Sequence, residues 1–339
     1  MFTAMFGSVE VGVIYALMAL GVYLSFRILD FPDLTVDGSF VTGGAVAAIM
    51  IASGSDPFVA TAAALAAGFV AGSITGILHT KGKINPLLSG ILMMIALYSI
   101  NLRIMGKPNV PLLAEETVIT KISSWWQELG IDAAMANLFQ SIGLGAFIPK
   151  TWGIVIAMFL LTFIIKILVD LFLKTEVGLS LRAVGDNDGM IRSFSANTDW
   201  MKVLGLGLSN ALVAFSGALI AQYNGFSDVG MGIGMIVIGL ASVIIGEALV
   251  GSSTIRRATF AVIIGAIVYR VIVSLALRVE FLETGDMKLI TAIIVIFALV
   301  VPKMLEKQKA SIRKKKRMME MQSTKNGRGE SVAAVESDL

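Results

Sequence analysis

Long apolar stretches separated by short polar connections account for most of this chain of 339 residues. A helix needs about 20 predominantly apolar residues to cross the hydrocarbon core of a bilayer. We therefore predict an all-α, polytopic membrane protein with about nine spanning helices, within a range of about eight to ten. The predicted spans cover residues 7–26, 39–53, 57–78, 86–106, 151–173, 203–223, 229–250, 258–279 and 287–303.

Basic and non-basic connections alternate between these spans. Cytoplasmic loops of membrane proteins carry an excess of Lys and Arg. The alternation therefore predicts an N-terminus outside the cell and a C-terminus in the cytoplasm. The basic connections are residues 79–83, 174–202, 256–257 and the C-terminal tail, and the neutral or acidic ones are residues 53–57, 225–229 and 280–286.

Residues 107–150 are extracytoplasmic in this topology. They carry the pair Trp125-Trp126 and end in an apolar run at 139–148. Tryptophan is enriched at the headgroup level of membranes, so we predict an interfacial amphipathic helix in this segment. A docking surface for an extracytoplasmic partner and a re-entrant hairpin are alternatives that the sequence does not separate.

Three acidic residues and a proline precede the second span, which holds only about fifteen apolar residues and is short for a full crossing. We therefore predict that part of residues 33–39, D-L-T-V-D-G-S, enters the membrane. Irregular backbone at that depth must be buried in protein or line a watery cavity, and an acidic residue such as Asp37 is a functional candidate there. A plain cytoplasmic loop is the alternative.

Glycines indicate where helices pack closely or break. A stripe at every fourth position in the third span lets another helix approach closely. A second cluster precedes the seventh span and indicates either close packing or a hinge. The stripe comprises Gly68, Gly72 and Gly76, and the cluster comprises Gly225, Gly230, Gly232 and Gly234.

Composition agrees with this interpretation. Hydrophobic residues make up 56% of the chain, charged residues 15%, and the mean hydropathy is +0.84, so the bilayer must be the solvent for much of the surface. The absence of cysteine excludes disulfides and thiolate metal sites, and the single His79 leaves no His-rich site. The first apolar run lacks a basic leading region, so we expect a span rather than a signal peptide. We expect no cofactor bound by this chain.

The C-terminal tail, residues 304–339, is basic. From Pro302 onward ten Lys/Arg and five Asp/Glu give +5, and because the whole chain carries +3 the remainder carries −2. The cluster Arg313–Arg317 is compatible with nucleic acid, but a basic segment directly after a span is the ordinary cytoplasmic anchor of a membrane protein beside its lipids. We predict a transmembrane domain over residues 1–303, a disordered cytoplasmic tail and no nucleic-acid partner.

Residues 174–202 form the one long polar stretch in the middle of the chain. Two glycines there permit turns around a short helical piece, and Asp186 or Asn187 can cap a second piece near residues 188–195. Two arginines, Arg182 and Arg192, can donate several hydrogen bonds to a protein surface. An ordinary basic loop is the alternative. The stretch carries the pattern T-x-x-G-x-x-x-R-A-x-G-x-N at Thr175, Gly178, Arg182, Ala183, Gly185 and Asn187.

This pattern resembles the cytoplasmic coupling loop of ABC-importer permeases. Together with residues 16–40 and 78–109 it makes the chain resemble the branched-chain amino-acid and ribose permease group, above all permeases that work with tryptophan/tyrosine-type binding proteins. The ending Ser193–Asn197 departs from the G-I-N common in that group, which leaves the end of the coupling helix open. The resemblance implies a bacterial cytoplasmic membrane, ABC ATPase subunits that bind ATP-Mg, an extracytoplasmic binding protein or lipoprotein, and a second permease copy.

The resemblance implies a transport subunit rather than an enzyme, and the chain lacks the G-x-x-x-x-G-K-[ST] loop of an ATPase. It would pass a small nutrient, an aromatic or branched amino acid by preference, by alternating access. A nucleoside, sugar or vitamin as cargo, and an ion-driven secondary transporter, are the alternatives. Polar residues within spans are pathway candidates, although pairing among themselves is the simpler explanation. They are Asp37, Ser39, Asn101, Asn210, Glu247 and Arg270, the last two as a potential pair.

Overall fold

The computed structural model describes residues 2–132, 151–193 and 197–276, together with isolated positions between 140 and 300. The chain divides into a unit of residues Met1–Thr291 and a second unit, Ala292–Leu339. Every helix and strand with described bounds belongs to the first unit. These are α1 (Phe2–Val22), the π-helix η1 (Tyr23–Ile28), α2 (Thr35–Ala52), α3 (Pro57–Thr80), α4 (Pro86–Met105), β1 (Asn109–Pro111), α5 (Val118–Glu128), α7 (Gly153–Phe172), α8 (Glu176–Ser193), α9 (Thr198–Asn224), β2 (Phe226–Asp228), α10 (Met235–Val250) and α11 (Ile255–Ala276).

Seven of the described helices are long and apolar enough to cross a membrane, namely α1 with η1, α2, α3, α4, α7, α9 and α11. Each coincides with a predicted span, so the polytopic all-α fold is confirmed. The predicted span 229–250 is shorter than expected, because α10 begins at Met235 and has 16 residues. The ninth predicted span, 287–303, and the tail, 304–339, lie outside the described residues except for isolated positions.

The core of the first unit forms around α1 and α9, whose spanning portions are mostly buried. All residues from Val13 to Leu20 of α1 are buried, which places that helix inside the bundle. The spanning portions of α4 and α7 are mostly exposed and carry large apolar side chains. These two helices therefore offer surfaces to lipid or to a protein partner.

Small residues let α2, α3 and α9 approach closely. A Cβ atom on Gly72 would overlap the carbonyl oxygen of Leu206, and one on Gly76 would lie 2.7 Å from the Cα of Val203. On the other side of α9, a Cβ on Gly43 would overlap the carbonyl oxygen of Ala214. The prediction that the glycine stripe of the third span is a packing surface is confirmed, and its partner is α9.

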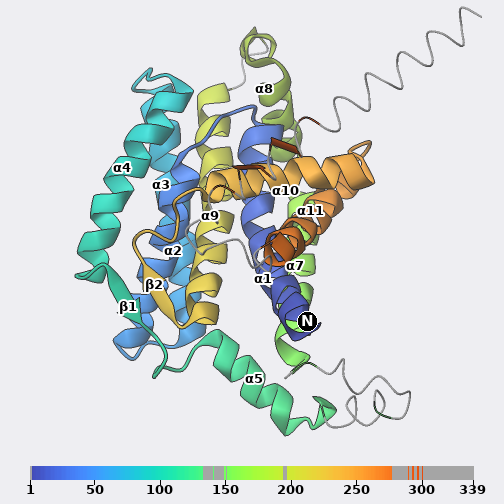
Figure 1. The fold of residues 1–339 in the computed structure, drawn as a ribbon. Coiled ribbons are helices and arrows are strands. Elements are labelled where there is room, and N and C mark those ends of the chain that lie inside the picture. The colour runs from blue at the N-terminus through green and yellow to red at the C-terminus, as the bar shows by residue number, and fades with distance from the viewer. Residues whose placement is uncertain are drawn as a thin grey trace, which may run out of the picture. The chain divides into compact units, whose positions relative to one another are not determined.

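The two ends of the bundle differ, as Figure 1 shows: α8 lies at one end, and α5 with the two short strands lies toward the other. The strands pair antiparallel, with Val110 opposite Ser227, and join the end of α4 to the end of α9. Helix α5 begins at a capping box formed by Thr117 and Thr120 and leaves Trp125 exposed. The predicted helix in residues 107–150 thus exists over 118–128, whereas its place at a membrane surface stays a prediction.

Candidate functional site

Two broken segments, the start of α2 and the start of α10, meet inside the bundle. After β2 the chain turns through Gly230–Gly234, and α10 starts behind Gly234, whose φ of 89° is left-handed and suits glycine. Asp37 in the first turn of α2 accepts hydrogen bonds from the N–H groups of Gly234 (2.9 Å, Oδ2) and Ile236 (2.8 Å, Oδ1). A carboxylate at a helix N-terminus satisfies free N–H groups and the positive end of the helix dipole.

The close approach of these segments depends on a glycine. A Cβ on Gly232 would overlap the carbonyl oxygen of Asp37. The predicted glycine cluster therefore serves a break before α10, and the predicted acidic segment supplies the cap for that break. The sequence indicated both features but not their contact.

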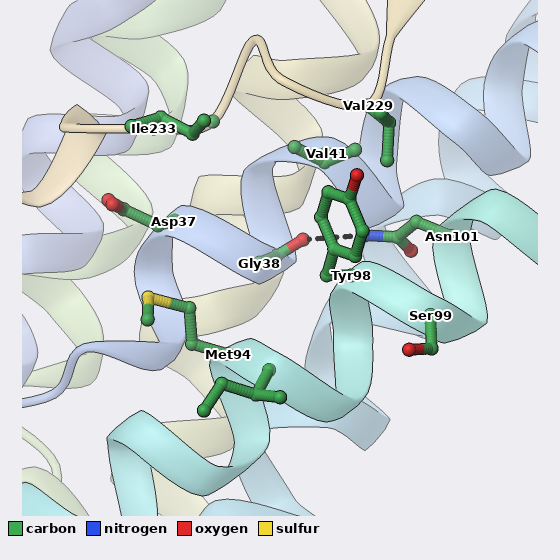
Figure 2. A pocket seen from close by; sticks show the side chains of 11 residues that line it. Asp37, Gly38, Val41, Met94, Tyr98, Ser99, Asn101, Val229 and Ile233 are labelled. Atoms are coloured by element: carbon green, nitrogen blue, oxygen red, sulfur yellow. Dashed lines mark hydrogen bonds between the residues drawn. The ribbon is translucent and has the colours of Figure 1, made fainter. Parts of the chain in front are cut away.

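A cavity of about 460 Å³ lies beside this junction, between α2, α4 and the segment 229–233 (Figure 2). Tyr98, Ser99 and Asn101 line it from α4 and Asp37 lines it from α2, although in Figure 2 the carboxylate of Asp37 points away from Tyr98. Asp37 is the one charged residue among those that line it, and most of the others are apolar. The lining residues are Asp37, Gly38, Val41, Met94, Ile95, Tyr98, Ser99, Asn101, Val229, Gly232 and Ile233.

Asn101 holds α4 against α2 at the back of this cavity. Its Nδ2 donates a hydrogen bond to the carbonyl oxygen of Gly38 (3.1 Å), and its side chain is fully buried. This bond fixes the orientation of the amide, because only the nitrogen can donate. The other amide atom, Oδ1, has no hydrogen-bond partner among the described residues. The wall of the cavity therefore contains a buried acceptor that lacks a donor.

The remaining predicted pathway residues lie elsewhere. Ser39 is buried and does not line the cavity, and Asn210 donates to Asp33 (2.6 Å) in the core. Arg270 lies over the ring of Tyr15, 4.9 Å from its centroid. The structure therefore brings Asp37 and Asn101 together and separates the others from them.

Buried Asp33, in the loop between η1 and α2, is held by neutral donors. Burial raises its pKa, although hydrogen bonds from Thr35 and Asn210 act in the opposite direction. The potential pair of Arg270 with Glu247 is not formed among the described residues. Glu247 instead accepts from Arg27 Nε at 3.0 Å, because the C-terminal end of α10 lies beside η1.

Helix α8 contains the predicted coupling pattern. Thr175 caps its start, since the Oγ1 atom accepts from the N–H of Gly178 (3.2 Å) and donates to the carbonyl oxygen of Phe172 (2.7 Å). The helix is interrupted at Asn187 (φ −160°, ψ 89°). Asn187 Oδ1 accepts from the N–H of Met190 (3.0 Å), which confirms the prediction that this region caps a second helical piece.

The two glycines of the pattern do not form turns, contrary to the prediction. Both lie inside the helix, where a Cβ on Gly178 would overlap the carbonyl oxygen of Phe172 and one on Gly185 would overlap that of Ile28. They are required for close packing instead. Through Gly185, α8 rests directly on the backbone of η1 at the end of α1.

The second piece of α8 is bound to the start of α9. Arg192 donates to Thr198 Oγ1 (2.9 Å) and to Asp199 (3.0 Å), and Lys202 donates to Asp188 (2.8 Å). Burial alone would raise the pKa of Asp188, but hydrogen bonds from Lys202 and Thr198 and the nearby cations outweigh it and lower that pKa. Arg192 is thus engaged within the chain rather than free for a partner.

Arg182 faces a polar cavity of about 330 Å³ instead. It shares that cavity with Tyr23 and Arg27 of η1, Asp186 of α8 and Glu247 of α10. Ala183 is half-buried on the same helix. The cavity is therefore bounded by η1, α8, α10 and the start of α11.

Apolar side chains are exposed on this otherwise polar segment. Val177, Leu179 and Met190 have exposed fractions of 38%, 51% and 50%. Exposed apolar side chains on a polar helix are available for contact with a protein partner. If a protein partner binds α8, its contact would depend on these apolar side chains and Arg182 more than on Arg192.

Sequence reasoning missed one buried ion pair. Lys166 and Asp170 of α7 bond to each other within an apolar span, and Thr259 Oγ1 of α11 donates to Asp170 (2.7 Å). The sequence spacing could have indicated this pair, since opposite charges four residues apart lie on one face of a helix. It also missed Tyr98 and Ser99, two polar-tipped residues in the middle of an apolar span. No group of three or more metal-binding side chains is found in the part of the chain that the structure describes.

Comparison with known proteins decides the family. A family model described as "Branched-chain amino acid transport system / permease component" matches residues 4–300. The chain belongs to this permease family. The permease is 46% identical over 283 residues to the tyrosine transport system permease protein of Clostridioides difficile (strain R20291), covering 84% of this chain and 86% of the relative.

Two more distant similarities were found. The permease is 23% identical over 232 residues to the ribose import permease protein RbsC of Escherichia coli (strain K12), covering 68% of this chain and 65% of the relative. A solved metal-chelate type ABC transporter in an inward-facing conformation aligns with a TM-score of 0.43 and 17% identity, over 88% of this chain and 84% of the other. The resemblance inferred from the sequence is confirmed: the permease is the membrane subunit of a bacterial ABC transport system whose ATPase is a separate chain.

Proposed function

We propose that the permease forms the pathway for an aromatic amino acid in a binding-protein-dependent importer. The similarity to a tyrosine transport permease supports this cargo class. In this proposal residues 1–303 cross the bacterial cytoplasmic membrane with about nine spans, the N-terminus lies outside, and α8 and the C-terminal tail lie in the cytoplasm. An extracytoplasmic binding protein or lipoprotein delivers the cargo, and a second copy of the permease completes the pathway.

The arrangement of α8 is the observation on which the coupling role rests. Thr175 and Asn187 fix its two pieces, and its exposed apolar residues Leu179 and Met190 suit a groove on an ATPase subunit. ATP-Mg binds to those ATPase subunits. Because Gly185 packs against the backbone of Ile28, a displacement of α8 would be transmitted to η1 and the buried helix α1.

Helix α10 extends this linkage to the other broken segment. Its C-terminal end bonds through Glu247 to Arg27 beside α8, and its N-terminal end bonds to Asp37 beside the cavity. Figure 1 shows α10 running across the direction of α9 between these two regions. ATP binding would close the ATPase dimer, move α8 and open the pathway outward, and hydrolysis would reset it.

Co-purification tests the coupling role. The tagged permease is expressed together with the ATPase encoded beside its gene, as wild type and as the variants Leu179→Asp and Arg182→Glu. Lys174→Ala is the control, because Lys174 is exposed and lies just before α8. We expect the ATPase to co-purify with wild type and control and to be lost from the other two. If wild type binds no ATPase and proteoliposomes of the permease alone move solute along an ion gradient, the proposal falls.

Uptake into proteoliposomes tests the cargo. The complete importer, with its binding protein and internal ATP, should accumulate tyrosine and should not accumulate ribose. Ribose uptake in place of tyrosine would favour the sugar alternative, which the ribose permease relative keeps open.

A further inference from the structure

The cavity beside Asp37 combines features that a permeation surface for an amino acid needs. Its walls are mostly apolar, it holds about 460 Å³, and ligand sites are generally hollows of roughly 300–1,000 Å³ with a few placed polar groups. Its one charged lining residue, Asp37, is negative and half-buried. Such a site suits a molecule with one cationic group and one apolar or aromatic group.

The face of α4 that borders the cavity carries polar groups, Tyr98, Ser99 and Asn101, in an otherwise apolar span. Tyr98 has an exposed fraction of 52%, and Ser99 beside it is also exposed. Polar groups in a span usually face protein or a water-filled cavity rather than lipid. Tyr98 also offers an aromatic ring, which attracts both a second ring and a cation over its face.

Asp37 can accept a further donor although it already caps α10. Its carboxylate accepts the backbone N–H groups of Gly234, Ile236 and Met235, and a carboxylate has about four acceptor positions in all, so capacity for one more donor remains. Asn101 Oδ1, buried in the cavity wall without a partner among the described residues, is a second acceptor. Asp37 and Asn101 present acceptors to the cavity, and the hydroxyl groups of Tyr98 and Ser99 can accept as well as donate, so a ligand that donates hydrogen bonds finds partners here.

We propose that this cavity is a cargo subsite, in which Asp37 pairs with the ammonium group of an amino acid and Tyr98, Met94 and Ile233 contact its aromatic side chain. The inference rests on the proposed function, because it gives the imported aromatic amino acid a place in the membrane subunit. The subsite binds cargo weakly, as a pathway must in order to release it. Because Asp37 also holds α10, cargo at this carboxylate contacts the element that reaches the α8 region.

The absence of cysteine from the chain provides a direct test. Ser99→Cys places a single thiol in the cavity with almost no change in shape, and Ser53→Cys places one in the exposed turn between α2 and α3 as the matched control. Both variants, in the assembled importer without binding protein, are reacted with a water-soluble maleimide. Tyrosine at about twice its Kd should slow the reaction of Ser99→Cys about threefold, since protection grows as 1 + [L]/Kd, and leave Ser53→Cys unchanged.

The chemistry is tested by the choice of ligand. Tyramine, which keeps the ammonium group and the ring, should protect Ser99→Cys, whereas hydroxyphenylpropionate, which lacks the ammonium group, and ribose should not. Adding Asp37→Asn should remove protection by tyrosine. If Ser99→Cys does not assemble, Ile95→Cys, another lining position, replaces it.

Each outcome has a distinct meaning. The subsite would be overturned if tyrosine protects both thiols equally, if it protects neither, or if Ser99→Cys is not labelled at all. It would also be overturned if ribose or hydroxyphenylpropionate protects Ser99→Cys as well as tyrosine does. Wild type that takes up tyrosine while Ser99→Cys is not protected refutes the subsite and leaves the proposed function intact. Protection by tyrosine without ATP-dependent uptake of tyrosine by the wild type supports the subsite and refutes the importer function.

Discussion

Removing the carboxylate of Asp37 should destabilise the permease through α10. Asp37→Ala leaves the N–H groups of Gly234 and Ile236, now bonded at 2.9 and 2.8 Å, without their acceptor. A buried donor left unsatisfied costs about 1–3 kcal/mol, and loss of an N-terminal cap costs about 0.5–2 kcal/mol, so we expect about 2–4 kcal/mol for the pair at this half-buried site. Asp37→Asn keeps one oxygen and should lose about half of that.

The assay is thermal unfolding of the detergent-purified permease, followed by the fluorescence of its four tryptophans. One kcal/mol moves the melting temperature of a domain of this size by about 2–4 °C, so Asp37→Ala should melt about 5–15 °C below wild type. Asp30→Asn is the matched control for Asp37→Asn, because Asp30 is exposed in the preceding loop and asparagine tolerates its positive φ of 51°. If Asp37→Ala melts as wild type does, the carboxylate does not hold α10, and the proposed linkage through that helix fails.

Three further outcomes are expected. Gly72→Ala should lower the melting temperature, because its Cβ would overlap the carbonyl oxygen of Leu206 and overpacking costs about 1–3 kcal/mol. The control Gly189→Ala should not lower it, since the nearest atom to its Cβ would be 3.6 Å away. Equal melting temperatures of the two variants would contradict the close packing of α3 on α9. Thr259→Val removes the donor to Asp170 and should cost about 1–3 kcal/mol, measured by the same assay; no loss would mean that the bond of the buried Lys166–Asp170 pair to α11 adds no stability. Lys121 lowers the pKa of Asp56, which caps α3, and Asp56 raises the pKa of Lys121. A carboxyl group whose pKa is lowered on folding stabilises the folded state at pH values above its unfolded pKa of about 3.9, and this stabilisation is lost as the pH falls through its folded pKa. Lys121→Gln should therefore speed hydrogen exchange in α5 at neutral pH, and the difference from wild type should disappear in acid. A difference that persists at low pH would refute that assignment.

Helix positions were predictable because apolar length alone specifies a span. The seven long helices coincide with predicted spans, since a bilayer requires that length whatever the packing. The break before α10 was indicated by its glycines, but its extent was not. Residues 229–234 are apolar enough to count as part of a span, and they leave the helix because Gly234 takes a left-handed φ and Asp37 caps the next residues.

The partners of polar residues were not predictable. Glu247 bonds to Arg27, which is 220 positions away in sequence, and Asn210 bonds to Asp33, 177 positions away. Such pairs depend on which helices become neighbours, and no local pattern encodes that. The role of Gly185 was misjudged for the same reason, because its neighbour Ile28 belongs to a helix more than 150 positions earlier. By contrast, the cap at Asn187 is a local contact and was predicted correctly.

The ribbon of β1 and β2 has a consequence for how this protein can change over generations. It is made of backbone bonds and extends beyond the strands, since Leu112 N–H donates to Gly225 (2.7 Å) and Val229 N–H donates to Pro108 (2.9 Å). Backbone bonds do not depend on side-chain identity, so α4 and the segment 229–233 stay joined at one end whatever residues face the cavity. A new selectivity can therefore arise by substitutions at positions such as Met94 or Ile233 without loss of the wall that carries them. Within one scaffold, the walls beside Asp37 are free to diverge while the ribbon stays the same.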